Sequence, residues 1–259
     1  CFCKNLFHNI VYNNSIFDSK MVFSEIIGGL LYAFIGSAYA SWLTQEFDNY
    51  GNKRSFFARS KCDHCGETLK WYNLIPIFSY IFQGFKSTCC KKTISIKYLI
   101  TEITLALIFI YIFLDIEFLA YGILIPLLFL LIFIDEKHKE IPLWLNGLIL
   151  LWVLINLNFS SVNLITALVV VTTLLLISFV FQKIRNKSGL GMGDIILLFS
   201  ISLYFGFPAV AYLISISSGA LLLKIILTRK YKEQHAFGSW LAGVFVLLIL
   251  FQEFYVSAS

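Results

Sequence analysis

Residues 118–142 read FLAYGILIPLLFLLIFIDEKHKEIP, an unbroken apolar run that ends in Asp135. An apolar run of this length is typical of a helix that crosses a membrane, because about 20 residues cover the hydrocarbon core of a bilayer. A second aspartate, Asp194, closes the motif GLGMGD at 189–194, directly before another apolar run. A carboxylate beside hydrocarbon is costly, so each aspartate is a candidate functional group.

The whole chain continues this pattern. Of its 259 residues, 59% are hydrophobic and 14% are charged, whereas soluble domains carry about 25% charged residues. The apolar runs are continuous rather than alternating, which excludes the strand pattern of a β-barrel. The sequence therefore predicts an all-α polytopic membrane protein with about eight transmembrane helices. The predicted spans are Val22–Trp42, Tyr98–Leu114, Phe118–Ile134, Ile141–Leu157, Val162–Phe181, Ile195–Phe207, Ala209–Leu227 and Phe237–Val256.

The basic residues indicate the orientation of these spans. Lysine and arginine gather at 53–97, 137–139, 183–187 and 229–232, which follow predicted spans one, three, five and seven. Because basic loops stay in the cytoplasm, we expect a multi-pass protein of the cell membrane with both termini outside. Both aspartates then face the cytoplasm. This topology accounts for the net charge of +5, and we expect the lipid bilayer, but no nucleic acid, as a partner.

The sequence predicts four segments. Residues 1–20 are polar and rich in asparagine, and we interpret them as an upstream or non-native segment before a start at Met21. Residues 21–44 form the first transmembrane helix, 45–97 a small cytoplasmic module that bears cysteines, and 98–259 a seven-helix membrane domain. A module of about 50 residues has a marginal core and usually needs a staple such as a metal ion.

The cysteines of this module have the chemistry of a structural zinc site. In the cytoplasm, metal binding by thiolates is favoured over disulfides. The first pair is spaced C-x-x-C, but the second pair is adjacent, and Ser87 stands where a regular pair would begin. Alternatives are a three-cysteine site completed by His64 and a metal-free loop. The candidate ligands are Cys62, Cys65, Cys89 and Cys90.

Two aspartates on one membrane face suggest acid–base chemistry. Hydrolysis of a peptide by paired carboxylates needs one ionised group to take a proton from water and one protonated group to polarise the carbonyl. Two close carboxylates do not both ionise easily, so the pair keeps one proton. Gly191 and Gly193 are candidate supporting residues that let the backbone turn before Asp194. The alternatives are an ordinary helix-end charge for Asp135 and a helix N-cap for Asp194.

At these residues the chain resembles the type IV prepilin peptidases, membrane aspartic peptidases of the Gly-x-Gly-Asp type. The resemblance runs from about Gly28 to Phe245, most of the chain. Its landmarks are Gly36-Ser37, the segments 62–66 (CDHCG) and 71–76 (WYNLIP), Ser79-Tyr80, Tyr98 with Glu102, the segments 135–142 and 191–194, and Phe237-Gly238.

The resemblance implies that Asp135 and Asp194 are the catalytic pair of a peptidase domain at 98–259. It implies cleavage of the basic leader of prepilins, or of pilin-like competence and secretion pseudopilins, on the cytoplasmic side. It also implies N-methylation of the new N-terminus with S-adenosylmethionine, an activity linked to the cysteine-bearing module. Two positions depart from the family pattern: the second cysteine pair is irregular, and Ile196 stands where lysine is frequent.

Three acidic residues have two interpretations each. Glu102, inside a predicted span, is a candidate supporting residue that contacts the new amino terminus or the methyl donor; otherwise it snorkels to the interface. Glu136 and Glu140 either attract the basic leader or offset Lys137 and Lys139 in a solvated loop. A different class of function is a polytopic transporter with intramembrane carboxylates, which would predict mid-membrane charges and inverted repeats; the sequence shows neither.

Overall fold

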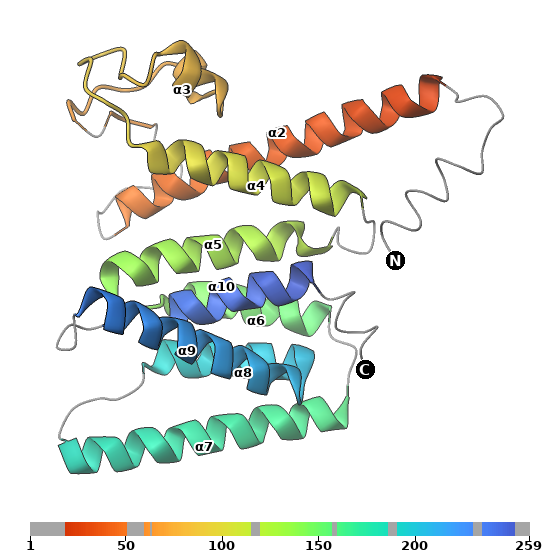
Figure 1. Cartoon of the computed structure of the whole chain (residues 1–259), viewed down its shortest axis with the longest axis vertical. Helices are drawn as coiled ribbons and strands as arrows, with labels where there is room; N and C mark the ends of the chain where they lie inside the picture. Colours follow the sequence, from red (N-terminus) through yellow and green to blue (C-terminus); the bar gives the residue numbers. More distant parts are fainter. Residues whose placement is uncertain are drawn as a thin grey trace. The chain divides into compact units, whose positions relative to one another are not determined.

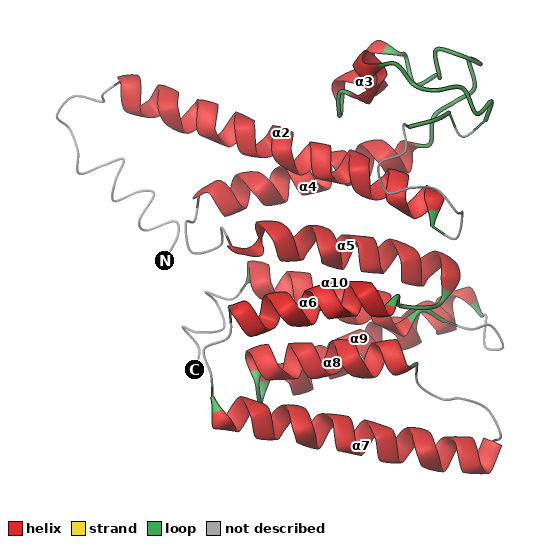
Figure 2. Ribbon diagram, turned by 180° about the vertical axis from the view of Figure 1, so that it is seen from behind, coloured by secondary structure: helices red, strands yellow, loops and turns green. Residues whose placement is uncertain are grey.

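The computed structural model describes residues 19–50, 60–62, 64–114, 120–156, 160–185, 191–229 and 235–251. Within these residues it contains nine α-helices and one short 3-10 turn, and Figure 2 shows helices and loops without a strand. The expected all-α fold is therefore confirmed for the described part of the chain. The chain divides into two compact units, Cys1–Trp42 with Arg59–Leu119 and Leu43–Ala58 with Ala120–Ser259.

The first unit rests on two long helices, α2 (Ser19–Asn49) and α4 (Ile96–Leu114), which lie side by side (Figure 1). Their backbones approach closely at Gly36, where a Cβ atom would lie 2.5 Å from the carbonyl oxygen of Leu105. The rings of Tyr32 and Phe113 meet further along, with centroids 5.0 Å apart. Within a lipid bilayer the hydrophobic effect does not drive helices together. Close packing at small residues stabilises their association instead.

The cysteine-bearing module precedes α4 and contains the turn η1 (Trp71–Leu74) and the short helix α3 (Phe78–Phe82). This small module has few core residues, and side-chain hydrogen bonds help to stabilise it. The Asn73 amide donates to Thr88 Oγ1 at 2.9 Å, and the Tyr80 hydroxyl donates to the carbonyl of Ile94 at 3.2 Å. The small module is thus held by specific polar contacts and by its cysteine cluster.

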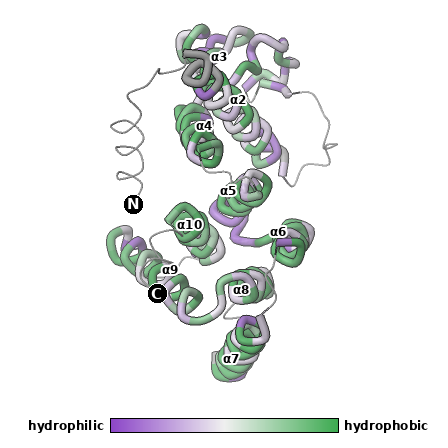
Figure 3. The backbone as a smooth tube through the Cα atoms, turned by 90° about the vertical axis from the view of Figure 1, so that its right-hand side faces the viewer, coloured by the Kyte–Doolittle hydropathy of each residue, from purple (hydrophilic) through white to green (hydrophobic). Residues whose placement is uncertain are grey.

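Among the residues that the structure describes, the second unit contains six complete helices and the last residues of α2. Helix α10 packs against α5, α8 and α9, while α8 also packs against α6 and α7; the view along the helices in Figure 3 shows α10 beside α5 and α9, with mostly hydrophobic colouring. These helices are α5 (Tyr121–His138), α6 (Leu143–Ile155), α7 (Ser161–Arg185), α8 (Met192–Phe205), α9 (Ala209–Thr228) and α10 (Phe237–Leu250).

The ends of three of these helices decide where the aspartates lie. Helix α5 continues beyond the predicted end at Ile134, so that Asp135 lies in its last turn. Lys139 ends the helix in the left-handed conformation (φ 59°), and its N–H bonds back to the carbonyl of Asp135 at 2.9 Å, a common way to terminate a helix. Helix α8 begins at Met192, so Asp194 lies in its first turn.

Each of the eight predicted spans coincides with a helix, but only some are long enough to cross a bilayer unaided. Helices α6, α8 and α10 are apolar but short; the 14 residues of α8 extend about 21 Å, against about 30 Å of hydrocarbon. By length and composition, four helices among the described residues qualify: Glu25–Asp48, Ile96–Leu114, Ser161–Ile184 and Ala209–Thr228.

Candidate functional site

The structure places both aspartates beside the first turn of α10. Asp135 is buried, and its Oδ2 accepts a hydrogen bond from the backbone N–H of Ser239 at 2.6 Å. An ideal Cβ atom at Gly238 would lie 2.9 Å from Oδ1 of Asp194 and 3.2 Å from Oδ2 of Asp135. The two carboxylate oxygens are therefore separated by no more than these two distances together. A single water molecule with hydrogen bonds of about 2.8 Å on each side spans a comparable separation.

Gly238 is the residue that makes this approach possible. A Cβ atom there would also overlap the side chain of Ile141. Any other amino acid would therefore displace the ends of the Ile141 and Asp194 side chains and crowd the Asp135 carboxylate. The requirement here is for space, because no positive φ is involved.

The glycines before Asp194 have a related role. A Cβ at Gly193 would lie 2.8 Å from Cβ of Ile141, and one at Gly191 would lie 3.2 Å from Oδ2 of Asp194. Gly193 thus lets the start of α8 pack against the α5–α6 connection. Asp194 is not the N-cap, because that position belongs to Gly191. Gly189 lies outside the described residues.

A buried asparagine on α6 was missed by the sequence reasoning. Asn146 is 1% exposed, and its Nδ2 donates to the carbonyl of Gly193 at 3.0 Å. Through this bond α6 holds the backbone of the residue that precedes Asp194. A lone asparagine inside an otherwise apolar run was the available signal, since an amide in lipid needs a partner.

The acidic neighbours of Asp135 are engaged by the protein itself. Glu136 Oε1 accepts a hydrogen bond from Lys224 Nζ of α9 at 2.6 Å, and Glu140 accepts one from the hydroxyl of Tyr50 at 3.4 Å. The sequence interpretations did not predict these partners. Glu136 is paired with Lys224 of the distant helix α9, and Lys139 of the adjacent loop also attracts its charge.

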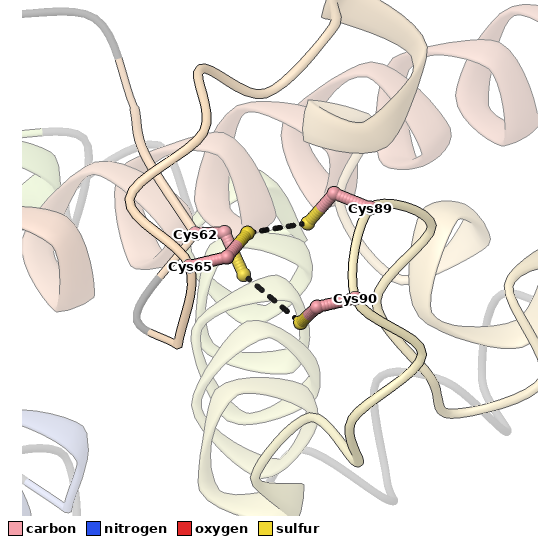
Figure 4. A group of neighbouring side chains, drawn as sticks. All are labelled: Cys62, Cys65, Cys89 and Cys90. Carbon is pink, nitrogen blue, oxygen red and sulfur yellow. Dashed lines mark hydrogen bonds between the residues drawn. The ribbon is translucent and has the colours of Figure 1, made fainter.

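The four cysteines of the module form one cluster (Figure 4). Their sulfur atoms all lie within 4.8 Å of one another. The cluster contains all four candidate ligands, and the adjacent cysteines Cys89 and Cys90 both point into it. Cys89 lies 3.2 Å from Cys65, and Cys90 lies 3.8 Å from Cys62.

The cluster consists of two nearly identical loops that are 25 residues apart. In the first, the N–H of Gly66 bonds to the carbonyl of Cys62 at 2.9 Å; in the second, the N–H of Lys91 bonds to the carbonyl of Ser87 at 2.8 Å. Isolated bridges pair Lys61 with Thr68 and, equivalently, Lys86 with Thr93. Ser87 thus occupies the position of Cys62, and Cys89 supplies the thiol that Ser87 lacks.

The geometry of the cluster fits a tetrahedral metal ion. Four sulfurs at about 2.3 Å from a zinc ion lie about 3.8 Å from one another, close to the separations observed. Burial opposes ionisation of the Cys62 thiol, but hydrogen bonds from Ser87 and from the backbone of His64 and Cys65 outweigh it and lower the pKa of Cys62 to about 6. The lowered pKa favours the thiolate, which is the form of cysteine that binds metal.

Glu102 belongs to the first unit. It is buried, and its Oε2 accepts the backbone N–H of Ile77 at 2.7 Å. Ile77 has a φ of 63°, which is costly for a β-branched side chain. Instead of snorkelling to the interface, Glu102 holds a strained turn of the module against α4.

These features define the class of protein: a helical membrane protein with a close pair of carboxylates, one of them buried, and a four-thiol module. Comparison with known families agrees. The bacterial peptidase A24 N-terminal domain matches residues 22–116, which contain the cysteines and Glu102, and the type IV leader peptidase family matches residues 122–251, which contain both aspartates. The chain belongs to the type IV leader peptidase family.

Relatives named prepilin leader peptidase/N-methyltransferase cover most of the chain. The one from Pectobacterium carotovorum subsp. carotovorum is 31% identical over 73% of this chain and 74% of its own length. That from Pseudomonas aeruginosa is 30% identical over 71% and 68%, and that from Dickeya chrysanthemi 29% over 71% and 70%. The expected family is thereby confirmed. No solved structure is a significant match.

Replacing Gly238 by alanine is expected to lower leader cleavage by about 100-fold or more, because displacing reacting groups by about 1 Å can cost that much. The matched control is Gly243→Ala on the same helix, where an added Cβ meets nothing within 4 Å. Cleavage of a coexpressed prepilin, measured by mass spectrometry, checks both. Equal activity of the two variants would contradict the crowding at residue 238.

Asn146→Leu is expected to slow cleavage by about 10-fold or more, since loss of one buried hydrogen bond costs about 1–3 kcal/mol. The effect should fall on kcat rather than KM, because Asn146 acts by positioning Asp194. Asn146→Thr keeps a donor and should retain more activity.

The control for this experiment is Asn163→Leu. The Asn163 amide also donates to a carbonyl of α8, that of Tyr204 at 3.3 Å, but at the other end of the helix. If Asn163→Leu slows cleavage as much as Asn146→Leu does, the effect is on the stability of α8 and not on the site.

Proposed function

We propose that this chain is a membrane aspartic endopeptidase that removes the basic leader of prepilins or pilin-like proteins. The supporting observation is the pair of carboxylates beside Gly238, in a chain of the type IV leader peptidase family. Related proteins are named as leader peptidases. Asp135 and Asp194 are the proposed catalytic residues, and Gly191, Gly193 and Gly238 allow their approach.

The surroundings of the pair suggest a division of roles. The Ser239 N–H and the N-terminus of α10 stabilise negative charge on Asp135, so Asp135 is the proposed base and Asp194 carries the shared proton. Asp135 takes a proton from a water molecule while the oxygen of that water attacks the scissile carbonyl carbon. Asp194 gives its proton to the carbonyl oxygen. On collapse, Asp135 protonates the leaving nitrogen and Asp194 recovers a hydroxyl proton, so the pair returns to its starting state.

The proposed topology places this chemistry on the cytoplasmic face. The basic segments 137–139, 183–187 and 229–232 support that orientation, with eight spans, a module at 45–97 and a peptidase domain at 98–259. A substrate whose leader is basic and whose next segment is an apolar helix would then lie in the bilayer with its cleavage site beside the carboxylates. A transporter is disfavoured, because both carboxylates lie at helix ends rather than at mid-helix.

A second activity is suggested by the names of the relatives, which include N-methyltransferase. We propose that the mature N-terminus is methylated, with S-adenosylmethionine supplying the methyl group when bound. The presence of the whole module, within the matched N-terminal domain, supports this proposal.

Asp135→Asn and Asp194→Asn are each expected to abolish cleavage while leaving the protein folded, since an amide neither takes the proton of the attacking water nor gives one as an acid. The measurement is the mass of the N-terminus of a coexpressed candidate prepilin, which reports cleavage and methylation together. Glu140→Gln, a neutralised carboxylate in the same connection, should cleave normally. Normal cleavage by either asparagine variant would refute the assignment.

We further propose that Cys62, Cys65, Cys89 and Cys90 hold a structural zinc ion. Bound zinc would tie the two loops together and stabilise a module with few core residues. The equivalent loop geometry and the inward direction of all four thiols support this.

Cys89→Ser is expected to lose the zinc found by elemental analysis of the purified protein, because three thiolates remain. The double variant Ser87→Cys/Cys89→Ser should retain it, because it restores a regular second C-x-x-C pair. Retention of zinc by Cys89→Ser alone would instead favour the three-cysteine site completed by His64.

A further inference from the structure

The module exposes several large apolar side chains next to its cysteine cluster. Phe82 is 85% exposed and Trp71 76% exposed, and Phe78 and Ile81 are also exposed on α3. The rings of Phe78 and Phe82 stack on each other with centroids 6.4 Å apart. Scattered exposed apolar residues are normal, but a group of aromatic residues within twelve positions indicates an interaction surface.

Glu102 fixes where this surface lies along α4. The residue that bonds to its carboxylate, Ile77, directly precedes α3. Glu102 is six residues after Ile96, the first residue of α4, so the attachment point lies about 9 Å along the helix axis. The start of α3 is therefore held beside the second turn of α4.

The length of α4 then sets the depth of that point in the membrane. Its 19 residues extend about 28 Å, which barely spans a hydrocarbon core of about 30 Å. No part of α4 is left over to stand in water, so its second turn lies within the bilayer boundary. Ile100 and Ile103, which flank Glu102, are accordingly exposed apolar residues.

The charges around the surface match one kind of partner. Residues 60–95 contain two acidic residues, Asp63 and Glu67, against five lysines. Lys70 lies over the ring of Tyr72 at 5.9 Å, next to Trp71. Aromatic residues beside lysines are typical of the membrane interface, where rings enter the acyl boundary and ammonium groups meet anionic headgroups. The five lysines are Lys61, Lys70, Lys86, Lys91 and Lys92.

We propose that the module is seated in the cytoplasmic leaflet of the bilayer through Trp71, Phe78 and Phe82, with its lysines facing anionic lipid headgroups. This surface rests on the proposed topology, in which α4 crosses the membrane, but not on the catalytic assignment. It gives Glu102 a role in positioning: its hydrogen bond to Ile77 holds α3 at the depth at which its apolar residues meet lipid.

Photocrosslinking tests this directly on the full chain in proteoliposomes that contain anionic phospholipid. Phe82 is replaced by p-benzoylphenylalanine, which is close to phenylalanine in shape, and adducts are identified by mass spectrometry. We expect lipid adducts at position 82 and few at the control position Glu67→p-benzoylphenylalanine, which is exposed but lies in the first cysteine loop.

Three results would overturn the proposal: a crosslink from position 82 to another part of the same chain, a crosslink to a second copy of it, or no lipid adduct above that at position 67. A further arm uses Glu102→Gln with the crosslinker at position 82. Because the amide is a weaker acceptor for the Ile77 N–H, the lipid adduct should fall at least severalfold, while a purely local role for Glu102 predicts no change. Lipid adducts require no cleavage, so this outcome is independent of whether Asp135 and Asp194 are catalytic.

Discussion

The close approach of Asp135 and Asp194 depends on the absence of a side chain at Gly238. Three structural elements meet there: the end of α5, the start of α8 and the first turn of α10. Because protein interiors are close-packed, a methyl group at this point would displace the ends of the Ile141 and Asp194 side chains and disturb the contact between the three elements. The same closeness brings Asp135 and Asp194 together, so helix packing and the chemistry of the site share one constraint.

Bringing two carboxylates together away from water has to be offset by other groups. One charge is removed if the pair keeps a proton. The remaining charge receives the Ser239 N–H, one of the four amides that a helix start leaves unpaired, so the bond to Asp135 costs no hydrogen bond inside α10. Glu136, which would otherwise add a second negative charge, is neutralised by Lys224. Each compensation comes from a different helix, which explains why the site requires the folded unit.

The positions of the helices can be predicted well from the sequence, but the side-chain contacts between them cannot. A run such as 118–134 is too apolar and too long to be anything but a helix in lipid, so its position follows from local composition. The bonds from Asn146 to Gly193 and from Lys224 to Glu136 join residues 47 and 88 positions apart. A polar residue inside an apolar run indicates that a partner is needed, but nothing local identifies the distant residue that provides it. The motif aspartates were recognisable only because their glycine and proline neighbours form a known pattern.

The cysteine cluster shows that four thiols can come together even where the second pair lacks the regular C-x-x-C spacing. A regular second loop would carry cysteine at 87 and 90; this chain carries serine at 87 and cysteine at 89. Because the backbone of the second loop repeats that of the first, Cys89 enters the cluster from one position inside the loop, at 3.2 Å from Cys65. Ser87 stays in contact, with its hydroxyl 2.8 Å from Cys89 and 3.4 Å from Cys62. A hydroxyl at that distance can donate to a thiolate and stabilise its charge. The exchange therefore keeps four thiols together, as a soft metal ion requires, and places a hydrogen-bond donor beside them.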